Sequence, residues 1–126
     1  GDERTRAIVR AYTDAIEGGD VDTVLDLLTE DATWSMPPYA VWFSGLGPIA
    51  AFLAEAPMTQ RWRHRPTTAN GQPAVGCYLW DDERETFAAE VIDVLTLRGD
   101  GRIEAVTAFI DPGLFPRFGL PARVDP

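Results

Sequence analysis

Residues 86–98 read TFAAEVIDVLTLR and carry the clearest strand pattern of the chain. Successive side chains of a strand point to opposite faces of a sheet, so every second residue shares a face. One carboxylate, Asp93, interrupts the otherwise apolar face of this stretch. The stretch therefore predicts a long strand with a single acid on its buried face. The residues of that face are Phe87, Ala89, Val91, Asp93, Leu95 and Leu97.

Turn signals on both sides of this strand predict a meander of antiparallel strands. Asn70-Gly71 is a strong signal for a tight hairpin turn. Acidic residues 81–83 precede the long strand, and the Gly-Asp-Gly sequence at residues 99–101 turns the chain again. The strands bounded by these turns are expected at about residues 60–69, 74–80, 86–98 and 102–110.

The first part of the chain shows helical periodicity instead. Apolar residues recur three and four positions apart up to Ile16, and the glycine pair at residues 18–19 suits a helix C-terminus. Asp20 is placed to cap a second helix, and Pro48 suits the first position of a third. We expect helices that end near residues 17, 29 and 54, a short strand over residues 32–36 and an extended piece over residues 39–44.

Helices that precede a run of strands indicate an α+β class. The chain has 126 residues, of which 45% are hydrophobic and 10% aromatic, so we expect one domain over residues 1–126. Its N-terminal helices should pack on a curved, mostly antiparallel sheet and form a cone that encloses a cavity. The proline-rich tail from Pro112 is expected to be an irregular segment that lies over the domain.

Charge and composition exclude several classes of protein. Twenty acidic and 11 basic residues give a net charge of -9, which repels nucleic acid and anionic membranes, so we expect no direct nucleic acid binding. One cysteine, Cys77, and one histidine, His64, exclude a disulfide framework and the usual zinc sites, and they suit the cytoplasm. Residues 32–54 carry no charge, but their prolines and glycines argue against a membrane span.

Asp93 and Tyr12 are the main candidates for functional side chains. Both lie on faces that are otherwise apolar, and helix packing on the sheet should bring them together. In an apolar cavity the pKa of Asp93 would rise, so that the acid could donate a hydrogen bond. Two structural alternatives remain open: Asp93 has a backbone partner, or the other strand face, with Ile92 and Val94, is the buried one. Tyr12 could equally be a core aromatic residue.

Several short stretches carry a resemblance to a known family: VRAY at residues 9–12, AIEGGD at 15–20, DAT at 31–33 and IDVLTLRGDGRI at 92–103. Together they resemble ketosteroid isomerase and its SnoaL-like, nuclear-transport-factor-2-like relatives over nearly the whole chain. In those isomerases the residues that match Tyr12 and Asp93 form the oxyanion hole. The position of the family's catalytic base falls at Met36, whose thioether cannot accept a proton.

A second set of stretches is fairly specific: WSMPP at 34–38, WFSG at 42–45, ANGQPA at 69–74, GCY at 76–78, DVLTLR at 93–98 and LFPRFGLP at 114–121. These are similar to the C-terminal SnoaL-like domain of certain actinobacterial extracytoplasmic-function sigma factors, over about residues 6–121. The resemblance implies a domain that modulates transcription through a small-molecule pocket. We expect either an accessory domain, in contact with sigma-factor domains outside this chain, or a stand-alone cousin.

Tryptophan and histidine supply the remaining candidates. Trp34, Trp42 and Trp62, together with Trp80, flank the expected cavity strands and could form an aromatic pocket, although core packing explains them equally well. His64 shares a strand face with Trp62 and is a candidate base. The arginines at positions 61, 63 and 65 indicate a solvated strand face.

Two functions follow. The first is a small-molecule-binding regulatory domain for a small apolar or aromatic ligand, without a cofactor or a metal. The second is a cofactor-free isomerase, cyclase or hydrolase in which Tyr12 and Asp93 stabilise negative charge and His64 or a bound water takes the proton. The expected ligand-binding residues are Tyr12, Trp34, Met36, Trp42, Trp62, His64 and Asp93. A homodimer is also expected, because relatives of this fold commonly pair through the convex sheet face, on which Ile92 and Val94 would be exposed.

Overall fold

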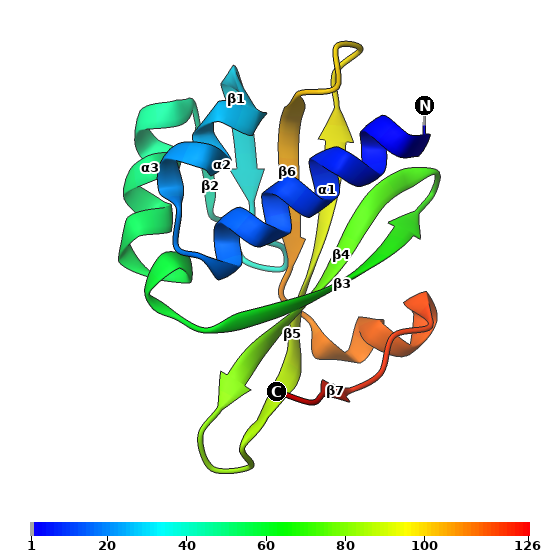
Figure 1. Cartoon of the computed structure of the whole chain (residues 1–126). Coiled ribbons are helices and arrows are strands. Elements are labelled where there is room, and N and C mark those ends of the chain that lie inside the picture. The colour runs from blue at the N-terminus through cyan, green and yellow to red at the C-terminus, as the bar shows by residue number, and fades with distance from the viewer. Residues whose placement is uncertain (1) are drawn as a thin grey trace.

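The computed structural model describes residues 2–126 and shows a curved seven-stranded sheet with helices α1, α2 and α3 packed on one face (Figure 1). The strand order is β2-β1-β6-β5-β4-β3, and β7 pairs with β5. Neighbouring strands are antiparallel except β1 and β6, which are parallel. The elements are α1 (Asp2–Glu17), α2 (Val21–Leu27), β1 (Leu28–Ser35), β2 (Trp42–Ser44), α3 (Leu46–Glu55), η1 (Pro57–Thr59), β3 (Trp62–Ala69), β4 (Gln72–Asp81), β5 (Thr86–Leu97), β6 (Ile103–Phe109), η2 (Pro112–Phe118) and β7 (Arg123–Val124).

The helices cover the inner face of the sheet and form the main core with it. Tyr12 and Ile16 of α1, Val24 of α2, and Ile49 and Leu53 of α3 are all buried in this cluster. Each helix therefore turns its apolar stripe toward the sheet, as its periodicity predicts. The expected α+β class, with helices on a mostly antiparallel sheet, is confirmed.

Most expected boundaries agree with the structure to within a few residues. The Asp20 side chain accepts a hydrogen bond of 3.1 Å from the Thr23 amide, which confirms the N-cap. Asn70 and Gly71 have φ angles of 51° and 81°, which confirms the tight hairpin turn. Helix α2 ends at Leu27 rather than near residue 29, because the next residue is already extended and pairs with β6.

The uncharged residues 32–54 do not form one helix but are shared among β1, β2 and α3. Helix α3 begins at Leu46, two residues before Pro48, which was expected to be its first residue. Gly45 precedes the helix with a φ of 89°, a conformation that favours glycine. No helix within residues 2–126 combines the length and the apolar character that crossing a membrane requires.

A β-bulge in β5 corrects the expected face of that strand. Cys77 of β4 pairs with Val91, but Tyr78 pairs with Ala89, so Glu90 is an extra residue on β5. An extra residue shifts the two-residue alternation by one. Val91, Asp93, Leu95 and Leu97 face the helices, as expected, whereas Phe87 and Ala89 face the opposite side with Ile92 and Val94. The prediction of one continuous face from Phe87 to Leu97 was therefore wrong.

The C-terminal segment covers the outer face of the sheet and is more regular than expected. It forms η2 and the strand β7, which pairs with β5 (Figure 1). Phe115 packs edge-on against Tyr78 at a centroid distance of 5.2 Å, and the Tyr78 hydroxyl donates a hydrogen bond to Pro121 O. Ile92 and Val94 are 0% and 8% exposed beneath this cover. The exposed apolar face on which the homodimer expectation depended is not present.

Candidate functional site

A pocket of about 300 Å³ lies between the inner face of the sheet and the helices α1 and α3. Helix α1 contributes Tyr12 and Ile16, and the C-terminal part of α3 and the following turn contribute Phe52, Ala56 and Pro57. The sheet supplies the remaining walls from five of its strands or their ends. The side chains on these strands are Trp34, Met36, Trp62, His64, Cys77, Leu79, Glu90, Val91, Asp93 and Ala108.

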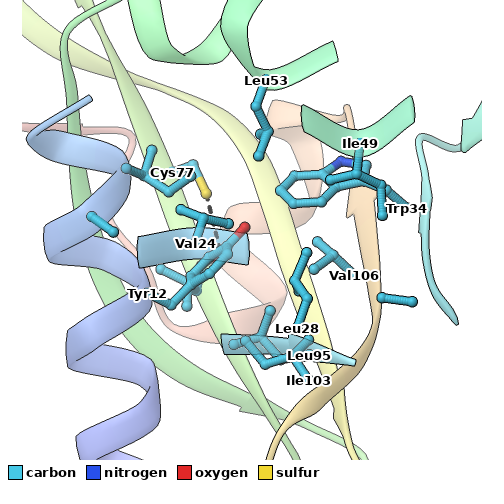
Figure 2. Packing of buried hydrophobic residues seen from close by; sticks show 14 of the residues in the cluster. Tyr12, Val24, Leu28, Trp34, Ile49, Leu53, Cys77, Leu95, Ile103 and Val106 are labelled. Atoms are coloured by element: carbon cyan, nitrogen blue, oxygen red, sulfur yellow. Dashed lines mark hydrogen bonds between the residues drawn. The ribbon is translucent and has the colours of Figure 1, made fainter. Parts of the chain in front are cut away.

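Tyr12 and Asp93 meet in this pocket. Asp93 occupies a central strand, paired with Val75 of β4 and Ala108 of β6, and it is 6% exposed. The Tyr12 hydroxyl donates a hydrogen bond of 2.8 Å to Asp93 Oδ2. Figure 2 shows this hydroxyl pointing away from α1, between Trp34 and Cys77. The structure thus brings together the two side chains that the sequence singled out.

Burial controls the protonation of these groups. Desolvation raises the pKa of Asp93, and the hydrogen bond from Tyr12 opposes that rise only in part. The pKa values of Tyr12 and Cys77 are raised well above their ordinary values, first by burial and then by the nearby Asp93. The site therefore holds an acid that is biased toward its neutral form, beside a neutral phenol and a neutral thiol.

His64 lies at the edge of the same pocket and is hydrogen-bonded to Glu17 of α1. Its Nδ1 lies 2.7 Å from Glu17 Oε2, and its side chain is 3% exposed. The ring Nε2 has no hydrogen-bond partner within residues 2–126. Glu17 was missed in the sequence, because 47 residues separate it from His64 and only the packing of α1 against β3 brings the two together.

Aromatic side chains form much of the apolar wall. The Trp34 ring lies 6.3 Å from that of Tyr12 and 5.7 Å from that of Phe52. The Trp62 indole nitrogen donates to Pro57 O. The Trp34 indole nitrogen is the one buried side-chain N or O atom without a hydrogen-bond partner in the described part of the chain. Phe52 was not recognised in the sequence, where nothing separates it from an ordinary core residue of α3.

Two of the expected tryptophans lie elsewhere. Trp42 is 63% exposed on the edge strand β2 and does not line the pocket. Trp80 packs against Phe87 in the outer cluster, at a centroid distance of 5.0 Å. Trp80 follows the unbroken alternation of β4, on which Cys77 and Leu79 face the pocket whereas Tyr78 and Trp80 face the outer cluster.

Met36 lines the pocket at the position to which the isomerase resemblance assigns the catalytic base, and its thioether cannot act as one. Glu90, at the bulge, adds a second carboxylate to the lining. Within residues 2–126 no three His, Cys, Asp or Glu side chains are grouped so that they could hold a metal ion. The arrangement can thus bind a mainly apolar molecule and offer it one central polar group.

Comparison with known proteins finds a family model and a sigma factor that match most of the chain. The family model described as SnoaL-like domain matches residues 9–106. The ECF RNA polymerase sigma factor SigG of Mycobacterium tuberculosis is 35% identical over 118 residues, which cover 90% of this chain. The matched region covers 31% of the sigma factor, so the chain spans about a third of the length of this relative.

Solved structures show the same fold. A putative ketosteroid isomerase from Kribbella flavida is 25% identical, with a TM-score of 0.69 over 86% of this chain and 78% of that one. An NTF-2-like protein of unknown function from Burkholderia xenovorans has a TM-score of 0.72 at 17% identity, over 87% of this chain and 84% of that one. The epoxide hydrolase/cyclase-like enzyme SalBIII, described in pyran ring formation in the polyether salinomycin, has a TM-score of 0.68 at 22% identity, over 87% of this chain and 92% of that one.

Proposed function

Because this chain belongs to the SnoaL-like domain family, we propose that it binds a compact, mainly apolar or aromatic small molecule and acts as a regulatory accessory domain of a sigma factor. One observation carries the binding proposal: an apolar, aromatic-walled pocket surrounds the buried hydrogen-bonded pair Tyr12 and Asp93. Pockets of this kind, apolar with a few convergent polar groups, are typical of small-molecule sites. The similarity to SigG supports the regulatory role.

Met36 supports binding rather than turnover. A family member that lacks a base at that position can retain the ligand but cannot use that residue to remove a proton. The net charge of -9 further supports a domain that acts through a ligand or a protein contact and not by binding DNA.

Native mass spectrometry of the purified protein tests the binding proposal, and quenching of tryptophan fluorescence by candidate ligands tests it in solution. Ala108 is 4% exposed and lines the pocket, so Ala108→Phe should fill it and abolish the added mass and the quenching. Ala51→Phe on the exposed side of α3 is the matched control and should leave both unchanged. Binding that survives Ala108→Phe would place the ligand elsewhere and contradict the proposal.

The regulatory part needs a second measurement. A ligand identified in this way should change in vitro transcription by a sigma factor that carries this domain. The same factor with the Ala108→Phe exchange should transcribe at the same rate with and without the ligand. An identical ligand response in both factors would contradict a regulatory role of the pocket.

A second candidate function is a cofactor-free isomerase, cyclase or hydrolase, favoured by the hydrogen bond between Glu17 and His64. A carboxylate that accepts a hydrogen bond from Nδ1–H fixes the tautomer in which Nε2 can act as a base. Enones and epoxides test it: turnover that disappears in His64→Ala and falls in Glu17→Gln, but survives in Met36→Leu, would establish an enzyme. If the parent protein binds these compounds but forms no product, the enzyme function is wrong and the ligand-binding function stands.

A further inference from the structure

The pocket contains acids but no arginine. Every basic residue of the chain other than its single histidine is an arginine, 11 in total, and none of them lines this pocket. Arg61 and Arg63 belong to β3 but alternate with the inward-facing Trp62 and His64. They lie over the rings of the outer cluster, with Arg61 4.6 Å from the Trp80 ring centroid and Arg63 4.7 Å from that of Phe87.

Asp93 has no cationic partner in direct contact. Its hydrogen bond comes from the neutral hydroxyl of Tyr12, and the neighbouring thiol of Cys77 is also neutral. His64 acts on Asp93 only through space, and its Nδ1 is already engaged by Glu17. Buried carboxylates in proteins are normally paired with a cation or coordinate a metal. Among residues 2–126 the pocket therefore contains a buried acid that has no arginine beside it and that would gain a counter-ion from a cationic ligand.

The pocket walls favour a particular counter-ion. Tyr12, Trp34, Phe52 and Trp62 present four aromatic rings to the same space. The faces of aromatic rings attract organic cations, most strongly where water is excluded. Glu90 adds a second negative group to the lining. An anionic ligand would meet two carboxylates and no fixed positive charge.

We propose that the pocket selects an organic cation, a compact aromatic or alicyclic ammonium, with Asp93 as its counter-ion. The inference rests on the proposed binding function and adds the chemical class of the ligand. Tyr12 holds the Asp93 carboxylate through one oxygen and leaves the rest of its acceptor capacity for the ligand.

Protonation gives the proposal a second consequence. The titratable groups around Asp93 are Tyr12 from α1, His64 from β3, Cys77 from β4 and Glu90 from β5, with Glu17 behind His64. Burial biases Asp93 toward its neutral form in the free protein, and a bound cation would ionise it. At a pH at which Asp93 is protonated in the free protein, binding of a permanent cation should therefore release a proton to solvent, and affinity should rise with pH through the raised pKa of Asp93.

Three probes of similar size distinguish the ligand classes: the cation benzyltrimethylammonium, the neutral ketone 4-phenylbutan-2-one and the anion 3-phenylpropanoate. Isothermal titration calorimetry in two buffers of different ionisation enthalpy gives affinity and proton release together. We expect the cation to bind at least about tenfold more tightly than either other probe, because it combines charge attraction to Asp93 with cation–π contacts to the aromatic walls. Tightest binding of the ketone, which needs Asp93 as a donor, or of the anion would overturn the inference.

Variants assign the selectivity to Asp93. Asp93→Asn keeps the shape of the side chain. It should reduce the affinity for the cation about 10-fold to 100-fold and leave the affinity for the ketone within about twofold of the parent value. Glu104→Gln, on the exposed side of β6, changes the net charge equally and should alter neither. If Asp93→Asn does not fold, Glu90→Gln must reduce the affinity for the cation more than the affinity for the ketone. Equal losses for both probes would overturn the inference.

The two proposals fail differently. If the ketone or the anion binds best and Ala108→Phe abolishes that binding, the pocket is a ligand site and only the cation inference is wrong. If no probe binds and the purified protein carries no added mass, both proposals are wrong.

Discussion

The hydroxyl of Tyr12 lies 2.8 Å from Asp93 Oδ2, across 81 residues of chain. It joins the first helix to the central strand of the sheet at a point where both residues are buried. This hydrogen bond thus fixes the position of α1 on the sheet and the orientation of the acid in the pocket. Two predictions follow from it directly, and two more concern the strands that hold the site.

Tyr12→Phe should reduce the free energy of unfolding by about 1 to 3 kcal/mol, because it leaves a buried carboxyl group without its donor. It should also raise the pKa of Asp93 further, since the hydrogen bond from Tyr12 lowers that pKa. Urea unfolding and an NMR titration of the Asp93 carboxyl carbon measure the two effects. Tyr39→Phe, at a position 61% exposed, is the control and should change neither. An unchanged stability in Tyr12→Phe would contradict the structure.

Stability should depend on pH through Asp93. The folded protein raises the pKa of this acid above its ordinary value of 3.8, so the folded state binds more protons than the unfolded state between the two values. The contribution of Asp93 is therefore most favourable below its unfolded pKa and is lost as the pH rises through the folded pKa. Asp93→Asn should remove this loss. The free energy of unfolding of the variant, relative to that of the parent protein, should therefore increase as the pH rises. A pH-independent difference would show that the pKa of Asp93 is not raised.

Phe87→Ala should cost about 3 to 5 kcal/mol of stability without altering the ligand pocket. Phe87 is fully buried, but the bulge at Glu90 directs it into the outer cluster. Chemical unfolding measures the loss, and affinity for any ligand of the pocket should stay within about twofold once the variant is folded. A selective loss of affinity would mean that Phe87 lines the pocket and that the bulge is absent.

Gly76→Val should loosen the C-terminal segment. A Cβ at position 76 would lie 2.7 Å from Leu120 Cδ1 and 3.1 Å from Phe115 Cε2, so the Leu120 and Phe115 side chains, which hold this segment on the sheet, must shift. Overpacking of this kind costs about 1 to 3 kcal/mol. Limited proteolysis should then cleave within η2 faster than in the parent protein. Gly99→Val, where a Cβ would meet no neighbouring atom, is the control, and equal cleavage rates would contradict the described packing.

The predictable part of this fold has local causes. Helix periodicity, the cap at Asp20 and the Asn70-Gly71 turn depend on residues close in sequence, and the structure confirms all three. The bulge at Glu90 was not predicted, because an extra residue in β5 is defined only by the register of its partner β4. The same shift explains why Phe87 lies outside the pocket.

Local patterns in the sequence account for the class of the protein, its charge and the contact of Tyr12 with Asp93, since an amphipathic helix must place its apolar face on the apolar face of the sheet. Three other features depend on the tertiary structure: the hydrogen bond of Glu17 with His64, the cover over Ile92 and Val94 and, within residues 2–126, the position of every arginine outside the pocket that contains Asp93. Each depends on which segments become neighbours after folding. Contacts between distant segments follow from the packing of whole elements, and no local spacing in the chain encodes them.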